Sequence, residues 1–179
     1  MRINRLFATI GSAIFIMSAS NASGQNNDPE NTLFLDLEQG RVVIDLLTED
    51  APTHTARIKE LARDGFYDGI IFHRVIDGFM AQTGDPTGTG RGGSGQGLAA
   101  EFNDVPFTRG VVGMARAQHP DSADSQFFIV FDDAQFLNGQ YTAWGRVSEG
   151  MEHVDAITRG EPPRNPDQIV QMRVAADVE

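Results

Sequence analysis

The stretch GIIFHRVIDGFMAQTGDPTGTGRGGSGQG, residues 69–97, determines how this 179-residue chain is organised. Its first half predicts two strands, 69–76 and 78–84, because it is rich in branched and aromatic residues and has a tight-turn signal at Asp77-Gly78. Its second half is a glycine-rich segment. Strands joined by so tight a turn pair antiparallel, so the stretch predicts a hairpin followed by a long glycine-rich connection.

The glycine-rich segment contains the pattern G-x-G-x-x-G, at Gly88, Gly90 and Gly93, which elsewhere binds the phosphates of a dinucleotide. Such a loop follows a buried parallel strand and opens directly into a helix. Here the next residues are SGQGLAAEFNDVPFTRG, 94–110, with more glycine, a proline and no helical run. The chain also has no Gly-Lys-Ser/Thr. We therefore interpret the segment as a connection that serves some other site.

The rest of the chain adds strands at short intervals. The segments 33–37 and 42–46 alternate apolar and polar residues around a turn, which predicts a hairpin with one buried face. Further strands are predicted at 109–117, 125–131, 141–147 and 168–175, and helices at 51–65 and 149–157. About eight strands with no long βαβ repeat and no linker predict an antiparallel barrel in one domain.

Two adjacent phenylalanines predict a second apolar site. Successive side chains of a strand point to opposite faces of the sheet, so Phe127 and Phe128 cannot both fill the barrel. One of them must face away from the barrel interior, into a pocket or a second core.

Composition limits the classes of function. With 40% hydrophobic residues the chain favours a folded domain over disorder. Its formal net charge of -11 argues against nucleic acid and anionic membrane surfaces as partners. It contains no cysteine, which excludes disulfides, thiol nucleophiles and cysteine-ligated metals.

Residues 1–22 have the pattern of a secretory signal peptide. Arg2 and Arg5 precede an apolar run from Leu6 to Met17, and Ser20-Asn21-Ala22 fits the small-x-small pattern before a cleavage site. The alternative is a retained membrane anchor, but the run is short against the about twenty residues that span a bilayer. We expect cleavage after Ala22 and a periplasmic protein that no longer associates with the membrane. An unstructured leader is predicted at 23–30 and one domain at 31–179.

Common catalytic arrangements are missing from the sequence. The four histidines lack the spacing of a zinc site, so we expect no metal. No G-x-S-x-G marks a hydrolase serine. His73 lies in a predicted strand, where we expect a packed, hydrogen-bonded side chain.

Four segments resemble one family, in the same order along the chain. They are FHRVIDGFMAQTGDPTGTGRGG (72–93), GVVGMARA (110–117), SQFFIV (125–130) and FLNGQYTAWGRV (136–147). From residue 31 to its C-terminus the chain resembles the cyclophilins, which are peptidyl-prolyl cis–trans isomerases. The resemblance implies a mainly β fold, a closed eight-stranded antiparallel β-barrel capped by two α-helices, with the site in a groove on its outer face.

The resemblance also implies the site residues. Arg74 matches the family's catalytic arginine, and Gln82 a glutamine that aligns the substrate backbone. The other matching groove positions are Phe79, Met80, Phe128 and Leu137 on the walls of the proline pocket, Gln126 as a second aligning group, and Gly90 and Ala115 in the lining. The glycine-rich segment would then border a bound peptide.

Three groove positions depart from the best-known family pattern. Phe136 stands where many members have tryptophan, Tyr141 where many have histidine, and Arg116 where many have asparagine. Phe136 lacks the N–H donor of an indole, so we expect weak cyclosporin binding at most. Tyr141 can still cover the proline ring, and Arg116 should alter the preference around proline more than the chemistry.

The resemblance leaves two functions to distinguish. The first is an isomerase, without a cofactor and as a monomer, that turns X-Pro bonds in proline-containing peptides and in exported proteins as they fold. The second is a module that binds proline-containing segments with little turnover. Arg74 discriminates between them, because binding alone would not require it.

Overall fold

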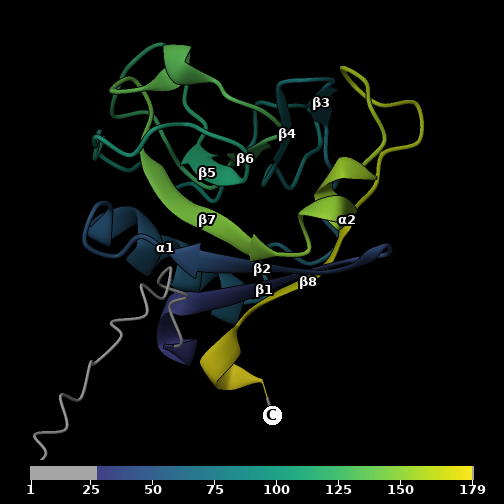
Figure 1. Cartoon of the computed structure of the whole chain (residues 1–179), viewed down its shortest axis with the longest axis horizontal. Coiled ribbons are helices and arrows are strands. Elements are labelled where there is room, and N and C mark those ends of the chain that lie inside the picture. The colour runs from purple at the N-terminus through teal and green to yellow at the C-terminus, as the bar shows by residue number, and fades with distance from the viewer. Residues whose placement is uncertain (1–27, 179) are drawn as a thin grey trace, which may run out of the picture.

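Alternating apolar residues build an eight-stranded antiparallel sheet that curls on itself (Figure 1). The computed structural model describes residues 28–178. The strands are β1 (Thr32–Leu37), β2 (Gly40–Leu46), β3 (Arg74–Ile76), β4 (Met80–Thr83), β5 (Val111–Met114), β6 (Phe127–Val130), β7 (Ala143–Glu149) and β8 (Ile169–Val174). The helices are α1 (Pro52–Arg63) and α2 (Met151–Asp155), with 3-10 turns η1 (Pro29–Asn31), η2 (Gln135–Leu137) and η3 (Ala175–Asp177).

The strand order, β3-β4-β6-β5-β7-β2-β1-β8, is closed into a barrel by the residues that precede β3. The N–H of Gly69 donates to the carbonyl of Ile169 over 2.7 Å, and the N–H of Phe72 donates to that of Asp167 over 2.9 Å. These bonds join the two edges of the sheet, which would otherwise be exposed. The predicted mainly β barrel with eight strands and two helices is confirmed. Residues 69–73 were predicted as part of β3, but this strand begins only at Arg74, and residues 69–72 instead pair with residues 167–169 at the start of β8.

Two apolar clusters lie on opposite faces of β6. The interior cluster fills the barrel with buried residues of β1, β2, β8 and both helices, together with Phe127 and Trp144. The outer cluster consists of Met80, Phe107, Val111, Phe128, Val130, Ala134, Leu137 and Ala143. The ring of Phe127 meets that of Trp144 edge to face, with centroids 5.5 Å apart, whereas Phe128 stacks on Phe107 at 5.8 Å. The prediction that one phenylalanine of the pair leaves the barrel interior is therefore confirmed.

Helices α1 and α2 both contribute to the interior cluster. Ile58, Leu61 and Ala62 form the buried face of α1, and Val154 is the buried residue of α2. Because the helices add apolar surface to the inner side of the sheet alone, the outer cluster stays accessible from outside the barrel.

Residues 28–30 of the predicted leader belong to the fold. The predicted signal peptide, 1–22, and residues 23–27 lie outside the described residues. Residues 28–30, expected to be unstructured, instead enter the fold through η1, where the Asp28 carboxylate accepts from the N–H of Glu30 over 3.0 Å. Glu30 pairs with Lys59 and Arg63 of α1, at 3.2 and 2.8 Å. Residues 28–30 are ordered, contrary to the prediction, because these ion pairs fasten Glu30 to α1.

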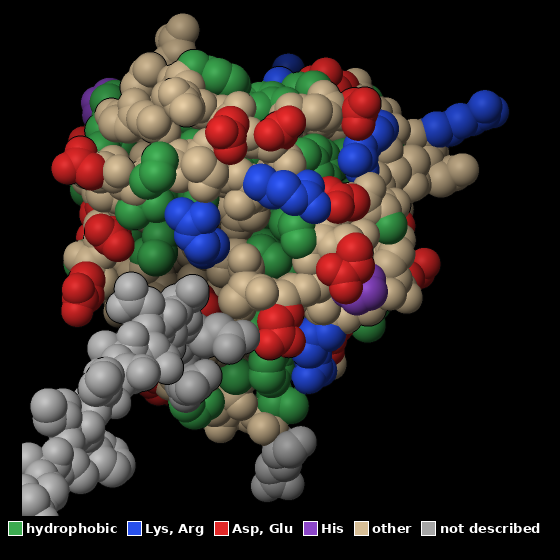
Figure 2. Space-filling model, in the orientation of Figure 1, with side chains coloured by type: hydrophobic (Ala, Val, Ile, Leu, Met, Phe, Trp, Pro, Cys, Tyr) green, Lys and Arg blue, Asp and Glu red, His purple; other side chains and the backbone are tan. Residues whose placement is uncertain are grey.

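Charged side chains of both signs are interspersed on the face shown in Figure 2. Ion pairs among the described residues include Arg41 with Asp36 at 2.7 Å and Arg173 with Asp68 at 2.6 Å. Within residues 28–178, no helix has the length and apolar character needed to cross a membrane.

Candidate active site

The outer cluster opens into a groove of about 790 Å³ on the outside of the barrel. All but one of the predicted site residues line it: Arg74, Phe79, Met80, Gln82, Gly90, Ala115, Arg116, Phe128, Phe136, Leu137 and Tyr141. The remaining one, Gln126, lines an adjoining hollow of about 460 Å³, which shares Gln82 and Arg116 with the groove. The fold thus gathers the predicted residues from five separate segments into one continuous surface.

One side of the groove is polar. The pairing of β3 with β4 sets Arg74 opposite Gln82. The side-chain amide of Gln82 donates to the side-chain oxygen of Gln126 over 3.0 Å, and the amide of Gln126 donates to the carbonyl of Gly92 over 2.8 Å. A guanidinium and two linked amides therefore follow one another along this side and can bond to the backbone of an extended peptide.

The other side of the groove is an apolar pocket. Met80, Phe128 and Leu137 form its floor and are almost fully buried. Phe79 meets Phe136 at its rim, with ring centroids 5.3 Å apart, and Phe136 remains 65% exposed. A closed apolar floor below an open aromatic rim suits a small apolar ring that enters from solvent.

The pocket floor depends on a glycine that sequence reasoning missed. A Cβ on Gly113 of β5 would lie 2.5 Å from the ring of Phe128 and 2.6 Å from that of Phe107. Both rings therefore lie directly over the backbone of β5, which a larger residue would prevent. The resemblance covered Gly113 within GVVGMARA, but nothing in its local sequence indicated which rings would lie against it.

Two of the departures from the family pattern contact each other. The guanidinium of Arg116 lies over the ring of Tyr141, 4.7 Å from its centroid, and donates to the carbonyl of Gln140 over 2.9 and 3.1 Å. Tyr141 in turn meets Phe128 edge to face, with centroids 5.7 Å apart. Arg116 therefore supports the tyrosine wall of the groove. Its expected effect on sequence preference stays a prediction.

The glycine-rich segment is held to the fold by two carboxylates. Asp85, which is almost fully buried, accepts from the N–H and the hydroxyl of Thr87 over 2.7 and 2.8 Å. Asp124 accepts from the N–H groups of Ser94 and Gly95 over 2.8 and 2.9 Å. Backbone donors that a phosphate would need are thus already bound to the protein's own carboxylates, which supports the interpretation against a nucleotide loop.

The pKa of Asp85 records how strongly the segment is held. Burial of the carboxyl favours its neutral form and by itself would raise the pKa. Hydrogen bonds from Thr87 and from the backbone of Gly92 and Gly90 outweigh burial and lower the pKa to about 2. The carboxylate is therefore ionised at neutral pH and fixes the course of the backbone around Gly90, at the edge of the groove.

His73 departs from its prediction in one respect. The side chain is packed, as expected, and borders the groove, but neither ring nitrogen has a hydrogen-bond partner among the described residues. Burial lowers the pKa of the imidazole, so the ring is neutral at neutral pH. The expectation of a hydrogen-bonded histidine is wrong because, among the described residues, the ring packs beside Gly90 at the groove and neither nitrogen meets a hydrogen-bond partner.

Glu161 is a groove residue that the sequence did not indicate. Its carboxylate accepts from the Nε–H of Arg74 over 2.8 Å, and both Glu161 and Pro162 line the groove. The two partners lie 87 positions apart in the sequence, and no local pattern relates them.

The arrangement can grip an apolar ring while a charged donor faces it, and this needs no covalent step. Among residues 28–178 no group of three or more His, Cys, Asp or Glu side chains is placed to hold a metal ion.

Comparisons with known proteins agree with this geometry. The model of the family described as cyclophilin type peptidyl-prolyl cis-trans isomerase/CLD matches residues 32–174. A probable peptidyl-prolyl cis-trans isomerase from Brucella suis is 50% identical over 167 residues, covering 84% of this chain and 85% of the relative. Peptidyl-prolyl cis-trans isomerase B of Bacillus subtilis is 42% identical over 128 residues, covering 70% and 89%.

Solved structures lead to the same family. The cyclophilin AquaCyp293 from Hirschia baltica has a TM-score of 0.79 at 32% identity, covering 85% of this chain and 76% of that one. A cyclophilin type isomerase from Cryptosporidium parvum, crystallised in the presence of the dipeptide Ala-Pro, has a TM-score of 0.75 at 28% identity, covering 80% and 98%. The chain therefore belongs to the cyclophilin family and is a peptidyl-prolyl cis–trans isomerase.

Proposed function

We propose that Arg74 is the catalytic residue and that it acts on the nitrogen of the X-Pro bond. Rotation of the bond breaks amide resonance, so the proline nitrogen gains a lone pair at the twisted transition state. A guanidinium that donates a hydrogen bond to this nitrogen stabilises the twisted amide more than the planar one. Arginine suits the task because it stays charged and holds its donors in a plane.

The magnitude of the effect is within reach of such a site. The uncatalysed barrier is about 18–20 kcal/mol, and turnover takes tens of seconds. Reaching milliseconds requires about four decades in rate, or roughly 5–6 kcal/mol. A charged hydrogen bond beside an apolar pocket, together with a held substrate backbone, supplies energy of this order.

The two sides of the groove divide the work of binding. The pocket of Met80, Phe128 and Leu137 receives the proline ring, while Gln82 and Gln126 bond to the flanking backbone. The observation that carries this proposal is the position of Arg74, which lines the same groove as the pocket and stands opposite Gln82.

The substrates that we propose are proline-containing segments of exported proteins, which the enzyme helps to fold in the periplasm. The support for this is the signal-peptide pattern of residues 1–22. N-terminal sequencing of the protein recovered from each cell fraction tests it. A periplasmic form that begins after Ala22 is expected, and a cytoplasmic form that still begins at Met1 would contradict export.

The experiment that tests the catalytic role compares Arg74→Ala with the parent protein. We expect the variant to lose about 100- to 1,000-fold in kcat/KM on a proline tetrapeptide, which is the effect of removing one transition-state donor. Affinity for the same peptide, measured by NMR titration, should change far less, because the apolar pocket remains.

The matched control is Arg164→Ala, which removes an exposed arginine from outside the groove lining and should leave turnover unchanged. Full turnover in Arg74→Ala would contradict the mechanism. Equal losses of kcat/KM and of peptide affinity would show that Arg74 serves ground-state binding, and they would likewise contradict its role at the transition state.

A further inference from the structure

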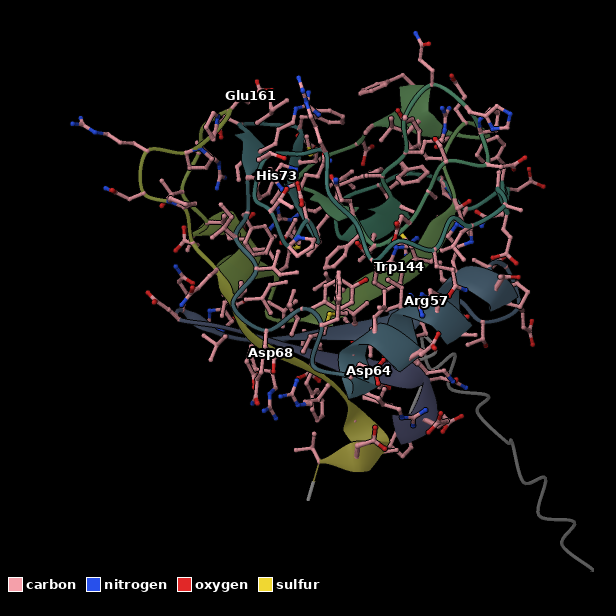
Figure 3. All side chains as sticks on the ribbon, turned by 180° about the vertical axis from the view of Figure 1, so that it is seen from behind. Arg57, Asp64, Asp68, His73, Trp144 and Glu161 are labelled. Carbon is pink, nitrogen blue, oxygen red and sulfur yellow. The ribbon has the colours of Figure 1, made fainter. Side chains whose placement is uncertain are left out.

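Among the described residues, the catalytic arginine forms one ion pair, with Glu161 in the groove lining. Glu161 accepts from Nε of Arg74 over 2.8 Å. Figure 3 shows Glu161 on the loop that follows α2, at the end of the barrel that also holds His73, the residue before Arg74. The pair is therefore part of the groove wall and not a remote surface contact.

The loop that carries Glu161 is attached to β3 next to Arg74. Gly160 and Val75 exchange two backbone hydrogen bonds, each of 2.8 Å, so the residues that follow and precede them, Glu161 and Arg74, are neighbours across this bridge. Gly160 has φ +150°, and a Cβ there would lie 2.5 Å from the Cα of Pro163. The backbone thus places Glu161 beside the guanidinium before any charge attraction acts.

The bond to Glu161 engages one edge of the guanidinium and leaves the rest of it available. Within residues 28–178, the terminal amino groups of Arg74 have no hydrogen-bond partner. Both side chains are partly exposed, 43% for Arg74 and 51% for Glu161. Such a pair contributes little to the stability of the fold, because solvent screens it. A pair that adds little to stability can still orient the flexible side chain of Arg74, because orientation depends on the hydrogen bond to Nε and not on the net free energy of folding.

We propose that Glu161 is a positioning residue for Arg74. By accepting from Nε it holds the guanidinium plane by its inner edge, and the terminal amino groups then face the nitrogen of a proline ring in the pocket. Arginine in solution samples many rotamers, so a fixed donor spares the transition state part of that ordering cost. The inference rests on the proposed catalytic role of Arg74.

The test compares Glu161→Ala and Glu161→Gln by NMR exchange measurements that separate kcat from KM. Glu161→Ala should lower kcat about tenfold and change KM less than about twofold, because only the transition state uses the aligned donor. Glu161→Gln should retain kcat within about threefold, because the side-chain amide oxygen still accepts a hydrogen bond from Nε. Equal kcat in Glu161→Ala and the parent protein would overturn the proposal.

A matched control separates positioning from loss of a negative charge. Asp77 accepts from Nε of Arg159 over 3.2 Å in a similar ion pair, lies three residues beyond Arg74 and stays outside the groove lining. Asp77→Asn should leave kcat unchanged. If Asp77→Asn lowered kcat as much as Glu161→Ala does, general electrostatics would explain the effect and positioning would be wrong.

The double variant tests the route of the effect. If Glu161 acts through Arg74, adding Glu161→Ala to Arg74→Ala causes no further loss of kcat. A further tenfold loss would show a role independent of Arg74 and overturn the inference. Should Arg74→Ala itself keep full turnover, the proposed function fails; a defective Arg74→Ala beside a fully active Glu161→Ala refutes the positioning role alone.

Discussion

The two faces of β6 carry neighbouring phenylalanines with different surroundings. Phe127 points into the barrel and touches Tyr67 and Trp144, all three of which are fully buried. Phe128 points outward, where the buried outer cluster meets the exposed rim at Phe136. One strand thus serves the interior with one face and the groove with the other. A single-residue change of register would exchange the two roles.

The comparison separates what holds the fold from what contacts a substrate. The interior cluster draws on the first hairpin, both helices and β8, so it joins the two ends of the chain. The outer cluster draws on the segments between β4 and β7 alone and ends in a groove. Substitutions in the interior cluster should alter stability, and substitutions in the outer cluster should alter both stability and catalysis.

The largest expected effect comes from truncating either phenylalanine. Phe127→Ala should lower the free energy of unfolding by about 4 kcal/mol, because it leaves a cavity in the interior cluster, yet the folded fraction should keep its turnover. Phe128→Ala should cost about 3 kcal/mol and also remove most of the isomerase activity of the folded fraction, because the floor of the pocket is lost.

Urea unfolding followed by circular dichroism gives the two free energies, and activity is then expressed per folded molecule. Activity lost to the same degree in both variants would show that the two clusters do not work independently. Such a result would contradict the distinction between an interior face of β6 that stabilises the fold and an outer face that serves catalysis.

The next largest effect is a loss of stability in acid, which we expect from Asp85 at the edge of the groove. The pKa of Asp85 is about 2 in the folded protein, below its ordinary value of 3.8. A lowered pKa means that the carboxylate stabilises the fold above the unfolded value, and that this contribution disappears as the pH falls through about 4 toward 2. The shift corresponds to about 2 kcal/mol at neutral pH. Unfolding free energies measured between pH 7 and pH 3 check it.

Asp85→Asn is the control for this pH dependence. It should lower stability at neutral pH by about the same 2 kcal/mol and remove this part of the acid sensitivity. If the variant and the parent protein lose stability in parallel as the pH falls, the hydrogen bonds of Asp85 are not its source.

The smallest effect on stability is expected at the rim. Because Phe136 is 65% exposed, Phe136→Trp should change the free energy of unfolding by less than about 0.5 kcal/mol. The indole N–H adds a donor at the groove, so cyclosporin affinity measured by calorimetry should rise about tenfold. Phe102→Trp, which adds the same ring outside the groove lining, should leave the affinity unchanged, and a rise there would refute a specific donor.

Most of the fold follows from local patterns in the chain. Every described strand lies in a segment that the local sequence predicts as extended, and adjacency alone predicts that Phe127 and Phe128 separate. The lengths of strands are less predictable, since Gly69–Phe72 is suited to extended backbone whether it pairs with β4 or with β8. The ion pairs of Glu30 also escape a local reading, because their partners lie on a helix far along the chain.

The candidate site, like the fold, has a part that the sequence predicts and a part that depends on tertiary contacts. The predicted residues lie in segments with long, specific resemblance, and the fold brings all but Gln126 into one groove, with Gln126 in the adjoining hollow. The sequence did not predict that Glu161 lies in the groove, because the bridge between Gly160 and Val75 places it there. Nor did it predict the contact between Arg116 and Tyr141, which depends on the approach of two loops. The sequence also did not predict that the ring nitrogens of His73 lack hydrogen-bond partners among the described residues, because this depends on which groups the fold brings around the ring.

The buried position of Trp144 has an optical consequence. It is the single tryptophan of the chain, it is fully buried against Phe127, and its N–H has no partner among the described residues. Its fluorescence therefore originates from inside the barrel, separated from the groove by the thickness of the sheet. The emission of this protein monitors unfolding with little interference from bound peptide, and a tryptophan introduced at Phe136 would give the groove a signal of its own.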